Sequence, residues 1–182
     1  MHRVLNRKLT YEDYAAAPAD GSIYQVIDGD VLVTPSPNPV HQRTSKRLQR
    51  QLEAYFEARG LGEVFNAPID LILSPHDILQ PDLAVVTDRS TISRRGIEAP
   101  PALVVEVLSP ASERHDRGLK ARRYAQLGVR HYWIVDPDAR RITCFELRGE
   151  TYAEVAAAEA PGTIESGTWP GLRVDLGAIW SA

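Results

Sequence analysis

Apolar and polar residues alternate along this chain in short blocks, and most of these blocks predict strands. The segment YQVIDGDVLVT predicts two strands joined by Asp28-Gly29, a pair typical of tight hairpin turns. APIDLIL and PDLAVVT both have strand composition, with SPHD as the turn between them. Further strands are predicted for PALVVEVLS, HYWIVD, RITCFEL and TYAEVAAA.

Three stretches have the spacing of helices instead. A short helix is expected over about 10–17, a long one over about 40–59 with a clear apolar stripe, and another over about 113–127 that ends at a glycine. Strands that precede and follow these helices indicate a mixed α/β (α+β) fold with a helix on each side of a central sheet. We expect one domain over residues 1–182.

Composition narrows the class of protein. The chain has 43% apolar and 25% charged residues, as in a globular protein with its own core. Cys144 is the single cysteine, so an internal disulfide or multi-cysteine zinc site is excluded. No apolar run approaches the ~18 residues of a membrane span. MHRVLNRKLTYEDY lacks the apolar stretch of a signal peptide, so we expect a cytoplasmic protein with no membrane partner.

Glu106 is the most informative single residue. It stands in LVVEVL, a continuous apolar run typical of a strand buried on both faces. A lone buried carboxylate costs several kcal/mol unless it is paired, protonated or bound to a metal. Glu106 is therefore a structural ion-pair partner, a strand-end residue that reaches solvent, or part of a functional site.

Asp82 follows Pro81 at the start of another apolar strand, LAVV. Taken alone, it is a turn residue. If its strand neighbours that of Glu106, two carboxylates converge at one edge of the sheet. Carboxylate oxygens suit Mg²⁺ or Mn²⁺, so the pair is a candidate metal site.

Lys120 adds a positive charge on the helix that follows Glu106. Its spacing places it on the small and apolar helix face with Tyr124 and Leu127, which favours a buried ammonium. The alternative is an exposed ion pair with Asp116, four residues earlier.

Other polar residues are candidates for the edge of such a pocket. His41 opens the long helix and is either a general base or substrate contact, or a structural residue. Asp70 lies in an alternating strand and can simply face solvent, and Ser109 can be a cap or a turn residue. The remaining candidates are Asp30 and Tyr124.

The net charge of −3 gives no general attraction to nucleic acid, so binding would need a local basic patch. The long helix offers one off its apolar stripe. Its members are Arg43, Lys46, Arg47 and Arg50. The chain has no nucleotide-phosphate loop, no GxSxG elbow and no paired His or Cys spacing for zinc.

The succession YQVIDGD, PSPNPVHQR, APIDLIL, QPDLAVV, PALVVEVLSPAS and GVRHYWIVDP resembles the Uma-type family of the PD-(D/E)XK restriction-endonuclease-like superfamily, over about residues 10–180. The resemblance implies a central mixed sheet flanked by helices, with Asp82 on the second strand of a hairpin and Glu106 on the next strand. It implies that these carboxylates hold a divalent metal, usually Mg²⁺. It also implies a nuclease acting on nucleic acid, above all DNA, and a homodimer.

One position departs from the superfamily pattern. A lysine two residues after the glutamate normally orients or activates the attacking water, and here that position is Leu108. The resemblance allows Lys120 to supply the amine from the following helix. Two other functions stay open. One is a catalytically silent nuclease-like fold that acts as a dimeric nucleic-acid-binding or interaction module, and the other is a metal-dependent hydrolase of a smaller substrate.

Overall fold

A computed structural model describes residues 7–181. Outside the described part lie residues 1–6 and residue 182. The expectation of no signal peptide concerns the first of these, and the expected domain of residues 1–182 includes both. Within the described part, no helix combines the length and the apolar character needed to cross a membrane.

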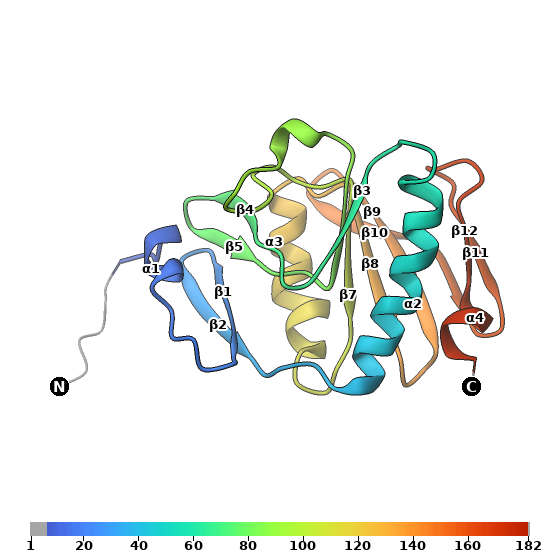
Figure 1. The fold of residues 1–182 in the computed structure, drawn as a ribbon, viewed down its shortest axis with the longest axis horizontal. Coiled ribbons are helices and arrows are strands. Elements are labelled where there is room, and N and C mark those ends of the chain that lie inside the picture. The colour runs from blue at the N-terminus through green and yellow to red at the C-terminus, as the bar shows by residue number, and fades with distance from the viewer. Residues whose placement is uncertain (1–6, 182) are drawn as a thin grey trace.

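The elements follow one another in mixed order (Figure 1). In chain order they are α1 (Tyr11–Ala15), β1 (Ile23–Ile27), β2 (Asp30–Thr34), α2 (Pro39–Phe56), β3 (Glu63–Asn66), β4 (Leu71–Ser74), β5 (Asp77–Leu79), β6 (Leu83–Val86), η1 (Arg89–Thr91), β7 (Leu103–Val107), η2 (His115–Lys120), α3 (Ala121–Gln126), β8 (His131–Asp136), β9 (Arg141–Arg148), β10 (Thr151–Glu159), β11 (Thr163–Glu165), β12 (Arg173–Asp175) and α4 (Leu176–Trp180).

The largest sheet has six strands in the order β10-β9-β8-β7-β6-β3. Only β7 and β8 are parallel neighbours, and the other pairs are antiparallel, so this sheet is mixed. A parallel pair needs a crossover connection, which the helical segments η2 and α3 supply. η2 is a π-helical turn that continues directly into α3, within the single helix expected over 113–127.

Different helices cover the two faces of this sheet (Figure 1). On one face, Leu48 of α2 packs in a core cluster with Val105 of β7. On the other face, Tyr124 of α3 packs with Val104. Successive strand residues point to opposite faces, so Glu106 lies on the α3 side. The predicted arrangement of a helix on each side of a central mixed sheet is confirmed.

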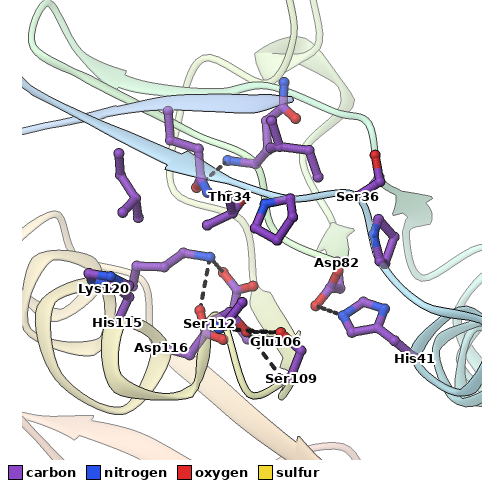
Figure 2. A pocket seen from close by; sticks show the side chains of 18 of the residues that line it. Thr34, Ser36, His41, Asp82, Glu106, Ser109, Ser112, His115, Asp116 and Lys120 are labelled. Atoms are coloured by element: carbon purple, nitrogen blue, oxygen red, sulfur yellow. Dashed lines mark hydrogen bonds and ion pairs between the residues drawn. The ribbon is translucent and has the colours of Figure 1, made fainter. Parts of the chain in front are cut away.

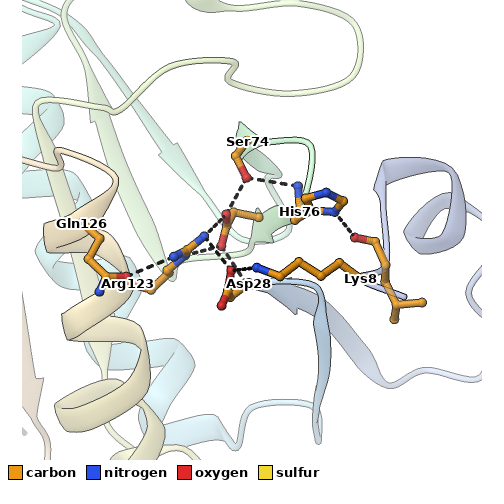
Figure 3. A network of polar contacts seen from close by, with 8 residues as sticks. Lys8, Asp28, Ser74, His76, Arg123 and Gln126 are labelled. Atoms are coloured by element: carbon orange, nitrogen blue, oxygen red, sulfur yellow. Dashed lines mark hydrogen bonds and ion pairs between the residues drawn. The ribbon is translucent and has the colours of Figure 1, made fainter. Parts of the chain in front are cut away.

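A second sheet, in the order β2-β1-β5-β4, lies beside α3 (Figure 1). Arg123 of α3 contacts both carboxylate oxygens of Asp77 at 2.7 Å, and Asp77 is fully buried. Asp77 also accepts hydrogen bonds from the Ser74 hydroxyl and the Asp28 backbone N–H, while Lys8 pairs with Asp28 (Figure 3). These contacts fix the β1–β2 and β4–β5 turns to the helix.

The hairpin predicted over YQVIDGDVLVT is confirmed, because β1 and β2 pair antiparallel. Asp28 and Gly29 have φ angles of 51° and 85°, as a type I′ turn requires.

The hairpin predicted from APIDLIL and PDLAVVT is wrong. β4 pairs with β5 in the smaller sheet, whereas β6 lies between β3 and β7 in the larger one. Asp82 therefore precedes a strand of the central sheet and not the second strand of that hairpin. With three and four residues, β5 and β3 are too short to show a period of two in the sequence.

Candidate metal centre and nucleic-acid groove

Asp82 and Glu106 face each other across neighbouring strands. Leu83 of β6 pairs with Val105 of β7, so Asp82 and Glu106 stand at the next position of the same antiparallel register. Residues opposite each other in such a pair point to the same side of the sheet. Both line one cavity of about 240 Å³ between the larger and the smaller sheet (Figure 2).

Asp82 is held in place by two donors. Its Oδ2 accepts a hydrogen bond of 2.7 Å from the backbone N–H of Val107, and it lies 3.1 Å from Nε2 of His41. His41 is 7% exposed near the start of α2, where its backbone N–H donates to the N-cap residue Asn38. Burial lowers the pKa of His41, but the hydrogen bond and charge of Asp82 outweigh burial and raise it. A protonated imidazole that donates to Asp82 is thereby favoured.

Glu106 belongs to a buried ion-pair cluster that also lines this cavity. Its Oε1 lies 2.5 Å from Nζ of Lys120 and accepts a 3.0 Å hydrogen bond from the Tyr124 hydroxyl. Nζ of Lys120 also lies 3.2 Å from Oδ1 of Asp116 (Figure 2). Only 3% of Glu106, 4% of Lys120 and 1% of Asp116 is exposed to solvent. Water therefore stabilises these charges little, and each charge is stabilised by its oppositely charged partner.

Burial and the neighbouring charges shift the pKa values of Glu106 and Lys120. It raises the pKa of Glu106 to about 8 against the attraction of the Lys120 ammonium, and the nearby Asp116 carboxylate adds to the rise. Burial lowers the pKa of Lys120, but Glu106 and Asp116 outweigh burial and raise it above its usual range. The Lys120 ammonium thus keeps its proton beside the two carboxylates.

The lysine of this site comes from the helix and not from the strand. Leu108, at the position where the superfamily pattern has a lysine, is 6% exposed and packs in the core cluster with Tyr124. Lys120 sits on η2 and lines the cavity. Lys120 and Asp116 do form the ion pair considered as an alternative, but the pair is buried and not exposed.

The oxygen atoms of Asp82 and Glu106 are the candidate ligands for a divalent cation. In the described residues, no group of three or more His, Cys, Asp or Glu side chains is placed to hold a metal ion. Within residues 7–181, the contacts of the two facing carboxylates use Asp82 Oδ2 and Glu106 Oε1, which leaves one oxygen of each available. Mg²⁺ is commonly held by one or two carboxylates plus waters and phosphate, so the pair fits such an open site.

The remaining pocket-edge candidates separate into three groups. Ser109 lines the cavity, where it forms a turn with Ser112. Tyr124 and Asp70 lie behind the wall: Tyr124 contacts Glu106, and Asp70 accepts a 2.8 Å hydrogen bond from the wall residue Gln80. The expectation for Asp30 is wrong, because it is exposed at the start of β2 and lines neither hollow described here.

A second hollow of about 590 Å³ continues from the first, and His41 and Asp82 line both. Arg43 and Lys46 of α2 line this second hollow, which we call the α2 groove. The side-chain amides of Gln49 and Asn66 also belong to residues that line this groove. Basic and neutral donors thus lead up to the acidic cavity.

The other two basic residues of α2 are not in the groove. Arg47 donates to the backbone carbonyls of Ile179 and Ser181, so it anchors the C-terminal helix α4. Arg50 is exposed but lines neither hollow. Arg47 was also expected to contact the nucleic-acid backbone, but its Nη1 is taken up by the carbonyls of Ile179 and Ser181 and its side chain lines neither hollow.

Some cavity residues escaped the sequence prediction. Asp116 was considered only as a surface partner of Lys120, although its spacing of four from a buried lysine also predicts a buried partner. Gln25, Gln80 and His115 also line the cavity. The burial of an amide inside a short strand depends on the packing of two sheets, which has no local signal in the sequence.

Comparisons with known proteins concern the family and the fold of the chain. The model of the Uma2 family, described as "Putative restriction endonuclease", matches residues 11–177. A crystal structure described as that of "a putative nuclease belonging to DUF820 from Anabaena variabilis ATCC 29413" is similar, with a TM-score of 0.77 and 16% identity over 95% of this chain and 98% of that one. No curated protein matches the chain. The predicted restriction-endonuclease-like fold is confirmed.

Proposed function

Because this chain belongs to the Uma2 family, described as "Putative restriction endonuclease", we propose that it is a metal-dependent nuclease that hydrolyses phosphodiester bonds of nucleic acid, with DNA as the first substrate to test. The observation that carries this proposal is the convergence of Asp82, Glu106 and Lys120 on one cavity. Two acids and one amine in a water-accessible hollow fit phosphoryl chemistry better than a purely structural ion pair.

Asp82 and Glu106 would hold the metal, Mg²⁺ or Mn²⁺, through their available oxygens. A divalent cation bound there would lower the pKa of a coordinated water and neutralise charge on the phosphate. Val107 N–H and His41 orient Asp82 for this role. The Tyr124 hydroxyl orients Glu106 in the same way.

Lys120 would serve the reacting phosphate directly. Its ammonium keeps its proton and lies in the cavity beside Glu106, where it can position the attacking water or stabilise the charge that develops on the phosphate. Its long side chain is confined by Glu106 and Asp116, so little reorganisation is needed when substrate enters. His41 lies at the junction of cavity and groove, because it lines both hollows.

Arg43 and Lys46 would hold the sugar-phosphate backbone beyond the scissile bond. They lie in the α2 groove, which opens into the cavity at His41 and Asp82. Phosphate neutralisation by such residues supplies sequence-independent affinity, in spite of the net negative charge of the chain. The proposed enzyme therefore binds the backbone along α2 and cuts beside Asp82.

The test is a cleavage assay on supercoiled plasmid and on single-stranded DNA, with Mg²⁺ or Mn²⁺ and with EDTA as the control. We expect metal-dependent cleavage by the wild type and none by Asp82→Asn. If the wild type binds DNA but cuts neither substrate, a catalytically silent binding module replaces the proposal. If it neither binds nor cuts DNA, a hydrolase of smaller substrates replaces it. Gel filtration of the same sample tests the expected homodimer.

A further inference from the structure

The cavity has a polar wall residue on the smaller sheet, Gln25, whose side chain the chemistry above does not use. Gln25 is 2% exposed on β1. Ile23 lines the cavity with it, and Ile27, two residues further on, belongs to the apolar core. These three residues share one face of the strand by alternation. Gln25 is thus a single amide on an otherwise apolar inward face.

The orientation of this amide is fixed by its one partner. The backbone N–H of Gln80 donates a 3.0 Å hydrogen bond to Oε1 of Gln25. A backbone N–H can only donate, so the bonded atom must be the oxygen and Nε2 must take the other position. Within residues 7–181, Nε2 of Gln25 donates no hydrogen bond, although the side chain is almost wholly buried.

The wall around Gln25 is braced. The side chain of Gln80 donates to the Tyr14 hydroxyl at 2.7 Å and to Asp70 at 2.8 Å, and it lines the same cavity. The Tyr14 hydroxyl in turn donates to Asp70 at 2.6 Å. Since Gln80 cannot shift without breaking these bonds, the acceptor oxygen of Gln25 stays in place, and so does its amide nitrogen.

A neutral donor has a specific use beside buried carboxylates. It attracts an acceptor oxygen of a ligand, yet it does not compete with a cation for Asp82 or Glu106. The ligand group that must enter this cavity in the proposed nuclease is a phosphate of the nucleic-acid backbone, whose non-bridging oxygens are strong acceptors. Lys120 lines the cavity from the helical turn η2 and Gln25 lines it from strand β1 of the smaller sheet, so together they can fix the phosphate from two elements.

We propose that Gln25 is a substrate-binding residue whose Nε2 donates a hydrogen bond to a non-bridging oxygen of the nucleic-acid phosphate in the cavity. The proposal rests on the proposed nuclease function and adds the smaller sheet to the substrate site. It also assigns a task to the β1–β2 hairpin, which then presents a phosphate donor toward the metal-binding carboxylates.

Two variants test this role. Gln25→Glu keeps an oxygen for the Gln80 N–H and loses the donor, but it adds a negative charge. Gln25→Met is neutral and loses both groups. The probe is a short fluorescent single-stranded oligodeoxynucleotide, whose binding is measured with Ca²⁺ in place of Mg²⁺. Mn²⁺ binding is measured separately by calorimetry, and thermal unfolding controls for folding.

Loss of one hydrogen bond to a charged phosphate corresponds to about ten- to hundred-fold weaker binding. We expect both variants to weaken oligonucleotide binding by this factor, while Gln25→Met leaves Mn²⁺ binding unchanged. In steady-state cleavage, Gln25→Met should raise KM more than it lowers kcat.

The outcomes separate this inference from the proposed function. If the wild type cleaves DNA and Gln25→Met binds the oligonucleotide within two-fold of it, the inference is overturned and the nuclease stands. If only Gln25→Glu weakens binding, the effect is charge repulsion and the inference is also overturned. If the wild type neither binds nor cleaves, the proposed function fails first, and the role of Gln25 falls with it.

Discussion

The ammonium of Lys120 lies 2.5 Å from Oε1 of Glu106, although the two residues belong to different elements and are fourteen positions apart in the sequence. Leu108, which follows Glu106 by two residues, packs in the apolar core instead. The strand therefore contributes the carboxylate and the π-helical turn η2 contributes the amine. The carboxylate and the amine of the superfamily pattern thus keep their order along the chain, but the amine comes fourteen residues after Glu106 instead of two.

Lys120→Met should damage both stability and activity. The substitution leaves the buried carboxylates of Glu106 and Asp116 without a cation, and breaking a buried ion pair in this way costs about 3–5 kcal/mol. Urea denaturation measures this loss. Cleavage should fall by at least about 100-fold, because the ammonium no longer acts on the phosphate. The matched control is Lys46→Met, an exposed lysine, whose stability should change by less than about 0.5 kcal/mol. Equal stability of the two variants would contradict the buried cluster.

Arg123→Ala should loosen the smaller sheet from α3. Arg123 makes two 2.7 Å contacts with the fully buried Asp77, so its removal leaves an unpaired buried carboxylate. We expect a loss of about 3 kcal/mol in the free energy of unfolding. Relative to the wild type, hydrogen exchange should become faster in β1 and β5 and change less in β7. Arg130→Ala is the control, because Arg130 is 70% exposed in its pair with Glu146. Similar effects of the two substitutions would argue against the anchoring role.

His131 should make the fold sensitive to acid. It is 4% exposed on β8, and burial lowers its pKa below the ordinary value of 6.5. The unfolded chain then binds more protons than the folded one just below pH 6.5, so stability is lost as the pH falls through the lowered folded-state pKa. Unfolding of the wild type and of His131→Gln is compared between pH 8 and pH 5. Their difference should change with pH, by at most about 1.4 kcal/mol per pH unit; a constant difference would contradict the prediction.

The α2 groove predicts a specific salt dependence. Arg43 and Lys46 line it, so each should release counterions when a phosphate binds. The double variant Arg43→Ala/Lys46→Ala should bind single-stranded DNA more weakly, with a slope against the logarithm of salt concentration that is less steep by about 1.4. Arg50→Ala serves as the control, because Arg50 is exposed on the same helix but outside the groove. An equal change of slope in both variants would place the bound single-stranded DNA outside the α2 groove.

The sequence was sufficient for the elements with strong periodicity and for the residues with strong chemistry. The apolar stripe of α2 and the run around Glu106 have patterns that few other structures produce. β3 and β5 are too short to carry such patterns, so the split of the strands into two sheets could not be predicted. That split decides which strand accompanies Asp82, and its cause is the long-range pairing of β6 with β3 and β7.

The site was predictable where a charged residue interrupts an apolar sequence pattern. Glu106 in an apolar strand and Lys120 on an apolar helix face both did so, and both lie in the cavity. Asp30 and Arg47 were candidates as well, but Asp30 is exposed outside both hollows and Arg47 anchors α4. Gln25 gives only a weak signal in the sequence, because one glutamine in a short strand is common. Its place in the cavity wall becomes visible only in the packing of the two sheets.

The central claim is that Asp82 and Glu106 together hold a divalent cation. Isothermal titration of Mn²⁺ into the wild type tests it most directly, beside Asp82→Asn, Glu106→Gln and the control Asp30→Asn, which alters an exposed carboxylate outside both hollows. We predict that the wild type and Asp30→Asn bind Mn²⁺ at one site and that each of the other two substitutions abolishes this binding. Mn²⁺ binding that survives either Asp82→Asn or Glu106→Gln, or no binding by the wild type, would contradict the account.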